Sequence, residues 1–349
     1  MIAWRPHTPG RRGVLWRLAA VCLLVVAVPA ASVAQTLRVA MPTEGFLYMP
    51  LYVAIDAGLM KAEGVEPVLV QFRGGGAAIT GLVSGSVELC TCAIQNAINA
   101  SVKGANVKLI GTIVGQYASN VVLRGDVAKR LGVTAQTPMP QRLAALRGLK
   151  LAASGAGSST DFLLRYLAQK GGLAPERDLT LLYLGGGGPI LAAFSQGRID
   201  GFALSSPTSD IALLKYGGAL LIDMSRGEFD DLRGYPSIML SAKASWLNTN
   251  AETARRVLRA LARADRMIRE QPAGAKQAVR KRFAGTADDV YEAAWKANLS
   301  AYPASPRVED AAVKRAVTFL GAVQGTRITG SSNDFFDNSH VDAAMSTIR

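Results

Sequence analysis

Two stretches of the chain share one order of predicted elements: strand, helix, strand, glycine-rich turn, helix, strand. In the first stretch the strand-like apolar runs are residues 37–40, 65–72 and 87–93, and the helical patterns are 50–57 and 77–83. In the second the runs are 149–153, 179–184 and 199–204, with one helix opening at Ser158 and another carrying Pro189. This alternation predicts an α/β protein with helices on both faces of parallel sheets.

The two stretches are related by a constant spacing of 112 residues, at which Phe72 aligns with Leu184. Glycines at positions 74, 75, 76 and 85 then align with glycines at 186, 187, 188 and 197. The same spacing places residues 37–40 on 149–152. Because two separate blocks agree at one offset, we expect an internal duplication that forms two lobes of similar build.

The chain after about residue 241 is helical and basic. Arginines at 255, 256, 259, 263, 266 and 269 alternate with Val257, Leu258, Leu261 and Ile268. This spacing predicts one apolar stripe with a solvated charged face opposite. Nucleic-acid binding is disfavoured, because no aromatic or glycine-rich recognition element accompanies the basic residues.

Residues 1–34 have the pattern of a secretory signal peptide. Four arginines precede an apolar run at 18–28, and Ser32-Val33-Ala34 has the small-x-small pattern of a cleavage site. Eleven helical residues extend only about 16 Å, too short for a hydrocarbon core of about 30 Å. We therefore expect cleavage after Ala34, a mature chain beginning at Gln35, and export to the periplasm by the general or the twin-arginine route.

Composition narrows the chemistry further. The net charge of +13 falls to +9 once the four arginines of the signal are removed. With three Cys and two His in the whole chain, a cysteine framework or a four-cysteine metal site is excluded. Cys90 and Cys92 share one face of a predicted strand, where a bridge across one residue would be strained, so we expect small buried filler. The sequence predicts no cofactor and no metal.

Several blocks together resemble a known family. The stretch from Pro50 to Val65 is similar to the opening block of the SsuA/THI5-like solute-binding proteins, the nitrate, sulfonate and thiamine-precursor group. The resemblance continues through the segments 74–76, 146–152, 157–161, 197–200 and 205–207, and it covers most of residues 37–271.

That resemblance implies a type II periplasmic binding protein fold, with two α/β lobes joined by two crossover strands and a ligand cleft between them. We expect the crossovers near residues 120–124 and 237–241. Lobe 1 would then comprise residues 35–122 and 240–349, with the C-terminal helices returning to it, and lobe 2 residues 123–239.

Ligands of open α/β sheets bind at the carboxyl ends of the strands, where loops and helix N-termini meet. Gly74 to Gly76 and Ser158 to Thr160 would present free N–H groups there, which suits a small anion. The candidate ligand-binding residues are Thr43, Glu44, Tyr48, Arg73, Gly74, Gly75, Gln95, Ser158, Ser159, Thr160, Gly186, Gly187, Ser206 and Pro207.

Alternatives stay open at several of these positions. The Ser158 to Thr160 hydroxyls could serve only as a helix cap, and the glycines at 185–188 only as a turn. Gln95 and its neighbour Asn96 could bind ligand or cap a helix. Glu44 would repel an anion unless it points away or pairs with Arg73, and otherwise favours an amine or a nitrogen heterocycle.

The sequence favours a carrier over an enzyme. The resemblance includes a pyrimidine synthase, but the cysteine-rich motif and active histidine of that type are absent, as are the G-x-S-x-G and H-E-x-x-H patterns. We expect a monomeric solute receptor without enzymatic activity. Its partners would be a small-molecule ligand and the membrane permease of an ABC transporter with a separate ATPase, and we expect no nucleic-acid partner.

Overall fold

The computed structural model describes residues 1–5 and 35–348. The chain divides into two compact units, Met1–Val33 and Ala34–Arg349, and the second contains both β-sheets. The predicted signal peptide and its cleavage after Ala34 lie outside the described residues apart from the first five. Within the described residues, no helix combines the length and the apolar character needed to cross a membrane.

The first sheet has five strands in the order β2-β1-β3-β10-β4. Their bounds are β1 (Gln35–Met41), β2 (Val65–Gln71), β3 (Leu89–Ala93), β4 (Val107–Val114) and β10 (Ile238–Lys243). Strand β1 pairs in parallel with β2 and β3, whereas β10 is antiparallel to both β3 and β4. The carboxyl ends of β1 and β3 therefore lie at one edge of this sheet.

The second sheet repeats this arrangement in the order β7-β6-β8-β5-β9. Its strands are β5 (Asn120–Arg124), β6 (Lys150–Ala153), β7 (Thr180–Tyr183), β8 (Gly201–Leu204) and β9 (Gly218–Ile222). Strand β5 is the antiparallel insertion here, as β10 is in the first sheet. Each sheet thus receives one strand from the other half of the chain, and elements 112 residues apart occupy equivalent places. The lobe boundaries at residues 122 and 240 stay a prediction.

Helices pack on both sheets in the predicted alternation. The first half contains η1 (Phe46–Tyr48), α1 (Met49–Asp56), α2 (Leu59–Ala62), α3 (Gly75–Ser84) and α4 (Ile94–Val102). The second contains α5 (Gly125–Leu131), α6 (Met139–Ala144), α7 (Ser159–Lys170), α8 (Pro175–Asp178), α9 (Gly187–Ser195) and α10 (Thr208–Lys215). The glycine-rich helices α3 and α9 begin at Gly75 and Gly187, which confirms the equivalence seen in the sequence.

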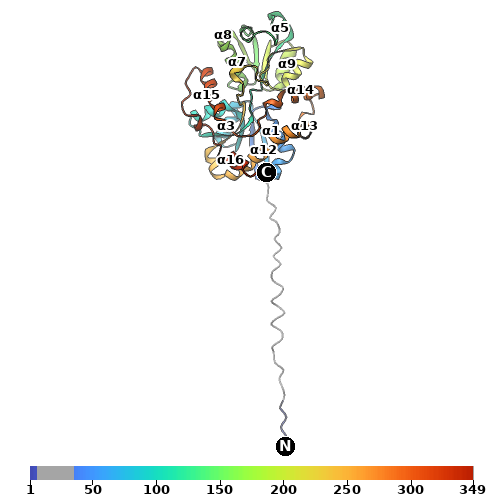
Figure 1. Ribbon diagram of the computed structural model, residues 1–349, viewed down its shortest axis with the longest axis vertical. Coiled ribbons are helices and arrows are strands. Elements are labelled where there is room, and N and C mark those ends of the chain that lie inside the picture. The colour runs from blue at the N-terminus through green and yellow to red at the C-terminus, as the bar shows by residue number, and fades with distance from the viewer. Residues whose placement is uncertain (6–34, 349) are drawn as a thin grey trace. The chain divides into compact units, whose positions relative to one another are not determined.

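The C-terminal helices contact elements of both halves of the chain. They are α11 (Ala244–Thr249), α12 (Ala251–Glu270), α13 (Pro272–Val279), α14 (Asp288–Asn298), α15 (Asp310–Gln324) and α16 (Ser339–Met345). Helix α12 packs against α1 and α16 (Figure 1). Helix α14 contacts α10, and α15 contacts both α4 and α7. The assignment of this whole segment to lobe 1 stays a prediction.

Ion pairs neutralise part of the positive charge of α12. Val257, Leu258 and Leu261 are buried, which confirms the apolar stripe. On the other face, Arg259 Nε and Arg263 Nη1 donate to the two carboxylate oxygens of Glu63, at 2.8 and 2.6 Å. The arginines of this helix thus anchor it to the α2 region as well as facing solvent.

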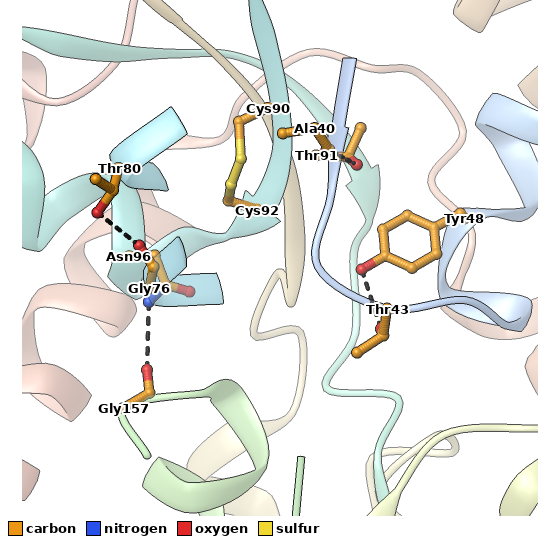
Figure 2. Close-up of a disulfide and its surroundings, with 10 residues drawn as sticks. All are labelled: Ala40, Thr43, Tyr48, Gly76, Thr80, Cys90, Thr91, Cys92, Asn96 and Gly157. Atoms are coloured by element: carbon orange, nitrogen blue, oxygen red, sulfur yellow. Dashed lines mark hydrogen bonds between the residues drawn. A yellow bond between two sulfur atoms is a disulfide. The ribbon is translucent and has the colours of Figure 1, made fainter. Parts of the chain in front are cut away.

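Cys90 and Cys92 lie fully buried in β3, and the structure joins them in a disulfide (Figure 2). The expectation that both side chains are small and buried is confirmed, whereas the link between them was not expected. Alternate residues of a strand point to the same face, which places the two side chains next to each other.

The two linkers between the sheets, residues 115–119 and 223–237, are held together by Gln116. Its amide nitrogen donates to the carbonyls of Met224 and Leu232, at 3.0 and 3.2 Å, and its amide oxygen accepts from Gly234 N at 2.7 Å. Because both linkers run between the sheets at this point, Gln116 ties together the two segments about which the lobes would turn.

Candidate functional site

A pocket lies where the carboxyl ends of strands from both sheets meet. In the arrangement that the structure shows, the cavity volume of this inner pocket is about 20 Å³, enough for about one water molecule. It is lined by Pro42, Thr43, Leu47, Tyr48, Gly74, Gly75, Ala93, Asn96, Ser119, Ser154, Ser158, Ser159, Thr160, Leu204 and Ile238. All of these lining residues are of uncharged types.

A larger, open cleft adjoins the inner pocket. The cavity volume of this outer cleft is about 790 Å³. Its additional lining residues are Glu44, Gln71, Phe72, Arg73, Gly155, Tyr183, Leu184, Gly185, Gly186, Gly187, Gly188 and Pro189. Pro42, Thr43, Gly74, Ser154 and Leu204 line both spaces, so the two form one continuous cavity.

Two helices begin at the inner pocket. Helix α3 starts at Gly75 after Gly74, whose φ of 89° is a conformation that glycine adopts without strain. Helix α7 starts at Ser159 after Ser158, which accepts a hydrogen bond from Asp161 N. The first amides of a helix have no intrahelical acceptor, so both N-termini offer N–H donors and partial positive charge to the pocket.

Helix α3 reaches the pocket because residue 75 has no side chain. A Cβ there would lie 2.3 Å from Asn96 Oδ1, far inside contact distance. In the second half, a Cβ at Gly187 would lie 2.2 Å from Thr208 Oγ1. Asn96 and Thr208 are themselves 112 residues apart, so each half packs its glycine helix start against a polar residue that follows the third strand.

Hydroxyls at the start of α7 form a connected network. Thr160 Oγ1 accepts from Ser154 N at 2.9 Å and lies 3.0 Å from both Ser154 Oγ and Ser158 Oγ. Ser158 Oγ accepts from Asp161 N at 3.3 Å. These contacts fix the side chains beside the helix N-terminus, and the capping role predicted for Ser158 is confirmed.

The opposite wall carries a second hydroxyl pair. Thr43 Oγ1 and Tyr48 Oη lie 3.3 Å apart, and both residues line the inner pocket (Figure 2). Burial raises the pKa of Tyr48 to about 12. At neutral pH the phenol therefore keeps its proton and can donate a hydrogen bond into the pocket.

The two halves of the chain touch on both sides of the inner pocket. On one side Asn96 Nδ2 donates to Gly157 O at 3.3 Å (Figure 2), and Tyr117 Oη donates to Ser159 O. On the other, Phe46 N donates to Ser206 O at 3.0 Å. These contacts hold the two halves against each other beside the inner pocket, so the structure is a closed form.

Charged groups lie at the margin of the cavity. Glu44 and Arg73 are exposed in the outer cleft, and no ion pair joins them among the described residues. Asp161 is buried near the α7 N-terminus, but it accepts from Gly157 N at 2.8 Å, Arg165 Nε at 2.9 Å and Tyr183 Oη at 3.1 Å. Its charge is therefore compensated by local hydrogen bonds and by the ion pair with Arg165.

Eleven of the predicted ligand-binding residues line this cavity, but three do not. Gln95 is buried and accepts from Tyr235 Oη at 3.1 Å. Ser206 accepts from Asn298 Nδ2 at 2.8 Å, and it lies with Pro207 outside both lining sets. These three belong to the packing behind the pocket. Lining residues that were not predicted from the sequence include Pro42, Leu47, Ser119, Ser154, Leu204, Tyr183 and Ile238.

Sequence signals exist for some of these missed residues. Pro42 and Ser154 come directly after the β1 and β6 strands, the positions at which α/β proteins bind ligands. Ser119 and Ile238 lie at the ends of the linkers, and no local pattern marks them. No group of three or more His, Cys, Asp or Glu side chains within the described residues is arranged to hold a metal ion.

A family model described as the NMT1-like family matches residues 45–284. The chain belongs to the NMT1-like family. The matched range contains the starts of α3 and α7 and therefore most of the cavity wall. It also agrees with the resemblance to SsuA/THI5-like proteins found in the sequence, which is confirmed.

The fold of this NMT1-like protein is that of the periplasmic binding proteins, as expected. A protein of Bordetella bronchiseptica RB50 aligns with a TM-score of 0.78 and 21% identity, over 89% of this chain and 97% of that one. The alkanesulfonate-binding protein SsuA from Xanthomonas axonopodis pv. citri, bound to MOPS, gives 0.67 and 20%, over 85% and 95%. The putative binding protein YtlA of Bacillus subtilis (strain 168) is 25% identical over 258 residues, 73% of each chain.

Proposed function

We propose that this NMT1-like protein is the solute-binding component of an ABC importer and captures a small anion in the inner pocket. The observation that carries the proposal is the meeting of two helix N-termini, those of α3 and α7, in a pocket lined by uncharged side chains. Each N-terminus contributes about half of a positive charge, so a small anion is held without a buried arginine.

The family and the fold support this proposal. SsuA from Xanthomonas axonopodis pv. citri, which shares the fold, binds alkanesulfonates. In this protein, a ligand of the sulfonate, nitrate or taurine type would occupy the inner pocket and be handed to a membrane permease driven by a separate ATPase. The protein would act as a monomer in the periplasm after removal of residues 1–34.

A second candidate ligand is a thiamine-pyrimidine or another nitrogen heterocycle. The observation in its favour is the exposed carboxylate of Glu44, which lines the outer cleft and could accept hydrogen bonds from amine groups. The anion is preferred because Glu44 does not line the inner pocket, where the helix N-termini converge.

The test is isothermal titration calorimetry on the mature chain, residues 35–349, with ethanesulfonate, nitrate, butyrate and 4-aminopyrimidine. We expect at least one anion to bind with one-to-one stoichiometry. Thr160→Val removes the hydroxyl at the centre of the α7 network and should weaken binding about tenfold, the cost of one or two hydrogen bonds to an anion. Arg73→Ala, in the outer cleft, is the control and should change the affinity less than about threefold.

Binding of the heterocycle alone would favour the second ligand class. Chemical conversion of a bound solute, followed by mass spectrometry of the recovered ligand, would instead assign the protein to the enzyme class. A set of titrations in which no anion binds would refute the proposal.

A further inference from the structure

Asn96 contributes both to the wall of the inner pocket and to the contact between the two halves of the chain. It stands in the first turn of α4, lines the inner pocket, and is only 6% exposed. Its Nδ2 donates to Gly157 O, in the loop before α7. Its Oδ1 is buried and has no hydrogen-bond partner among residues 35–348.

The orientation of this amide follows from the chemistry of its partner. A backbone carbonyl can only accept a hydrogen bond, so the end of the amide that faces Gly157 O must be the nitrogen. The other end, which faces away from Gly157, is then the oxygen. Figure 2 shows this oxygen turned to the side on which Thr43 and Tyr48 lie, and both of those residues line the same pocket.

Neighbouring polar groups are already engaged. Thr43 and Tyr48 pair with each other across 3.3 Å, and the hydroxyls of Ser154, Ser158 and Thr160 form their own network. A buried amide oxygen without a donor costs about 1–3 kcal/mol, and folded proteins contain few such groups. A donor supplied by the ligand would remove that cost in the bound state.

We infer that the solute carries a hydroxyl or N–H donor beside its anionic group, and that this donor binds Asn96 Oδ1. The inference rests on the proposed function, and it narrows the ligand class from small anions in general to hydroxy- or amino-substituted sulfonates and carboxylates. The helix N-termini hold the anionic group, and Asn96 Oδ1 accepts a hydrogen bond from the neighbouring donor.

The experiment compares ligands that differ by one group. Calorimetric titrations use 2-hydroxyethanesulfonate against propane-1-sulfonate, and 3-hydroxypropionate against butyrate, since a methyl group replaces the hydroxyl in each pair. The wild-type mature chain should bind at least one hydroxyl ligand about tenfold more tightly than its methyl counterpart, because a site built to hydrogen-bond a hydroxyl discriminates against its loss. Titrations with 2-aminoethanesulfonate test an ammonium donor at the same place.

Asn96→Leu has a similar volume but no acceptor, and it should reduce that preference to about twofold or less. A variant whose lobes close less well would bind both ligands of a pair more weakly. The ratio of its two affinities is therefore unaffected by such a loss. Circular dichroism shows whether the variant is folded. If the folded variant binds neither ligand, the ratio of the two affinities in the wild type decides the inference alone.

Equal binding of both members of each pair to the wild type would overturn the inference and leave the proposed function intact. The same holds for a hydroxyl preference that survives in Asn96→Leu. Binding of none of these anions would instead be a failure of the proposed function itself.

Discussion

Asp265 lies inside the apolar face of α12, where both oxygens of its carboxylate are buried and have no hydrogen-bond partner in the described part of the chain. Burial raises its pKa well above the usual value, and the positive charge of Arg269 offsets this only in part. The folded protein therefore retains a proton that the unfolded chain has already lost. As pH rises above about 4, stability falls until the folded-state pKa is passed.

Asp265→Asn keeps the shape of the protonated acid without its charge. We expect the variant and the wild type to have similar free energies of unfolding near pH 4. Above that pH the variant should gain by up to about 1.4 kcal/mol per pH unit until the carboxylate of the wild type is ionised. Urea unfolding at pH 4, 6 and 8 measures the difference, and a difference independent of pH would show that this carboxylate is not the cause.

At the residue scale, local chemistry was predictable and long-range neighbours were not. The cap formed by Ser158 is visible in the sequence because its partner, Asp161 N, is three residues away. Gln95 and Ser206 were assigned to the cleft because they follow strands, yet their partners Tyr235 and Asn298 lie far along the chain. The spacing predicts the burial of Asp265, because this residue lies on the same helical stripe as Leu258, Leu261 and Ile268.

At the element scale, the start of α3 depends on close packing against α4. Because a Cβ at residue 75 would meet Asn96 Oδ1 and Cγ at 2.3 and 2.9 Å, Gly75→Ala must displace Asn96. Overpacking of this kind costs about 1–3 kcal/mol. The displacement would also break the contact of Asn96 with Gly157 and change the pocket wall.

We therefore expect Gly75→Ala to weaken binding of the best anion by about tenfold or more. Gly76→Ala is the matched control, because a Cβ there would meet no atom within 4 Å. In the control, loss of a helical glycine should leave the affinity unchanged and stabilise the protein by up to about 1 kcal/mol. Equal affinities of the two variants, measured by calorimetry, would contradict the packing described for α3 and α4.

The repeat of 112 residues made most elements of both sheets predictable, because each strand and helix could be checked against its counterpart. The exchange of β5 and β10 between the sheets came from the family resemblance, since no local pattern assigns a strand to a sheet. The sequence did not show which elements α14 and α15 pack against. Amphipathic spacing shows which face of a helix is apolar, but it does not show which element covers that face.

At the scale of the whole molecule, both sheets bring their strand ends to one cavity, and the two linkers meet at Gln116. Contacts on either side of the inner pocket, by Asn96 and Phe46, hold the halves together. A receptor of this build would open about residues 115–119 and 223–237 to admit its solute. In the proposed function, the closed arrangement would place the N-termini of α3 and α7 around a single anion.

A crystal structure of the mature chain with ethanesulfonate tests this account most directly. The sulfonate oxygens should lie within hydrogen-bond distance of the first-turn amides of α3 and α7, with the hydroxyl of Thr160 or Tyr48 nearby and no charged side chain in contact. A sulfonate bound against Arg73 in the outer cleft, or outside the cavity altogether, would contradict it.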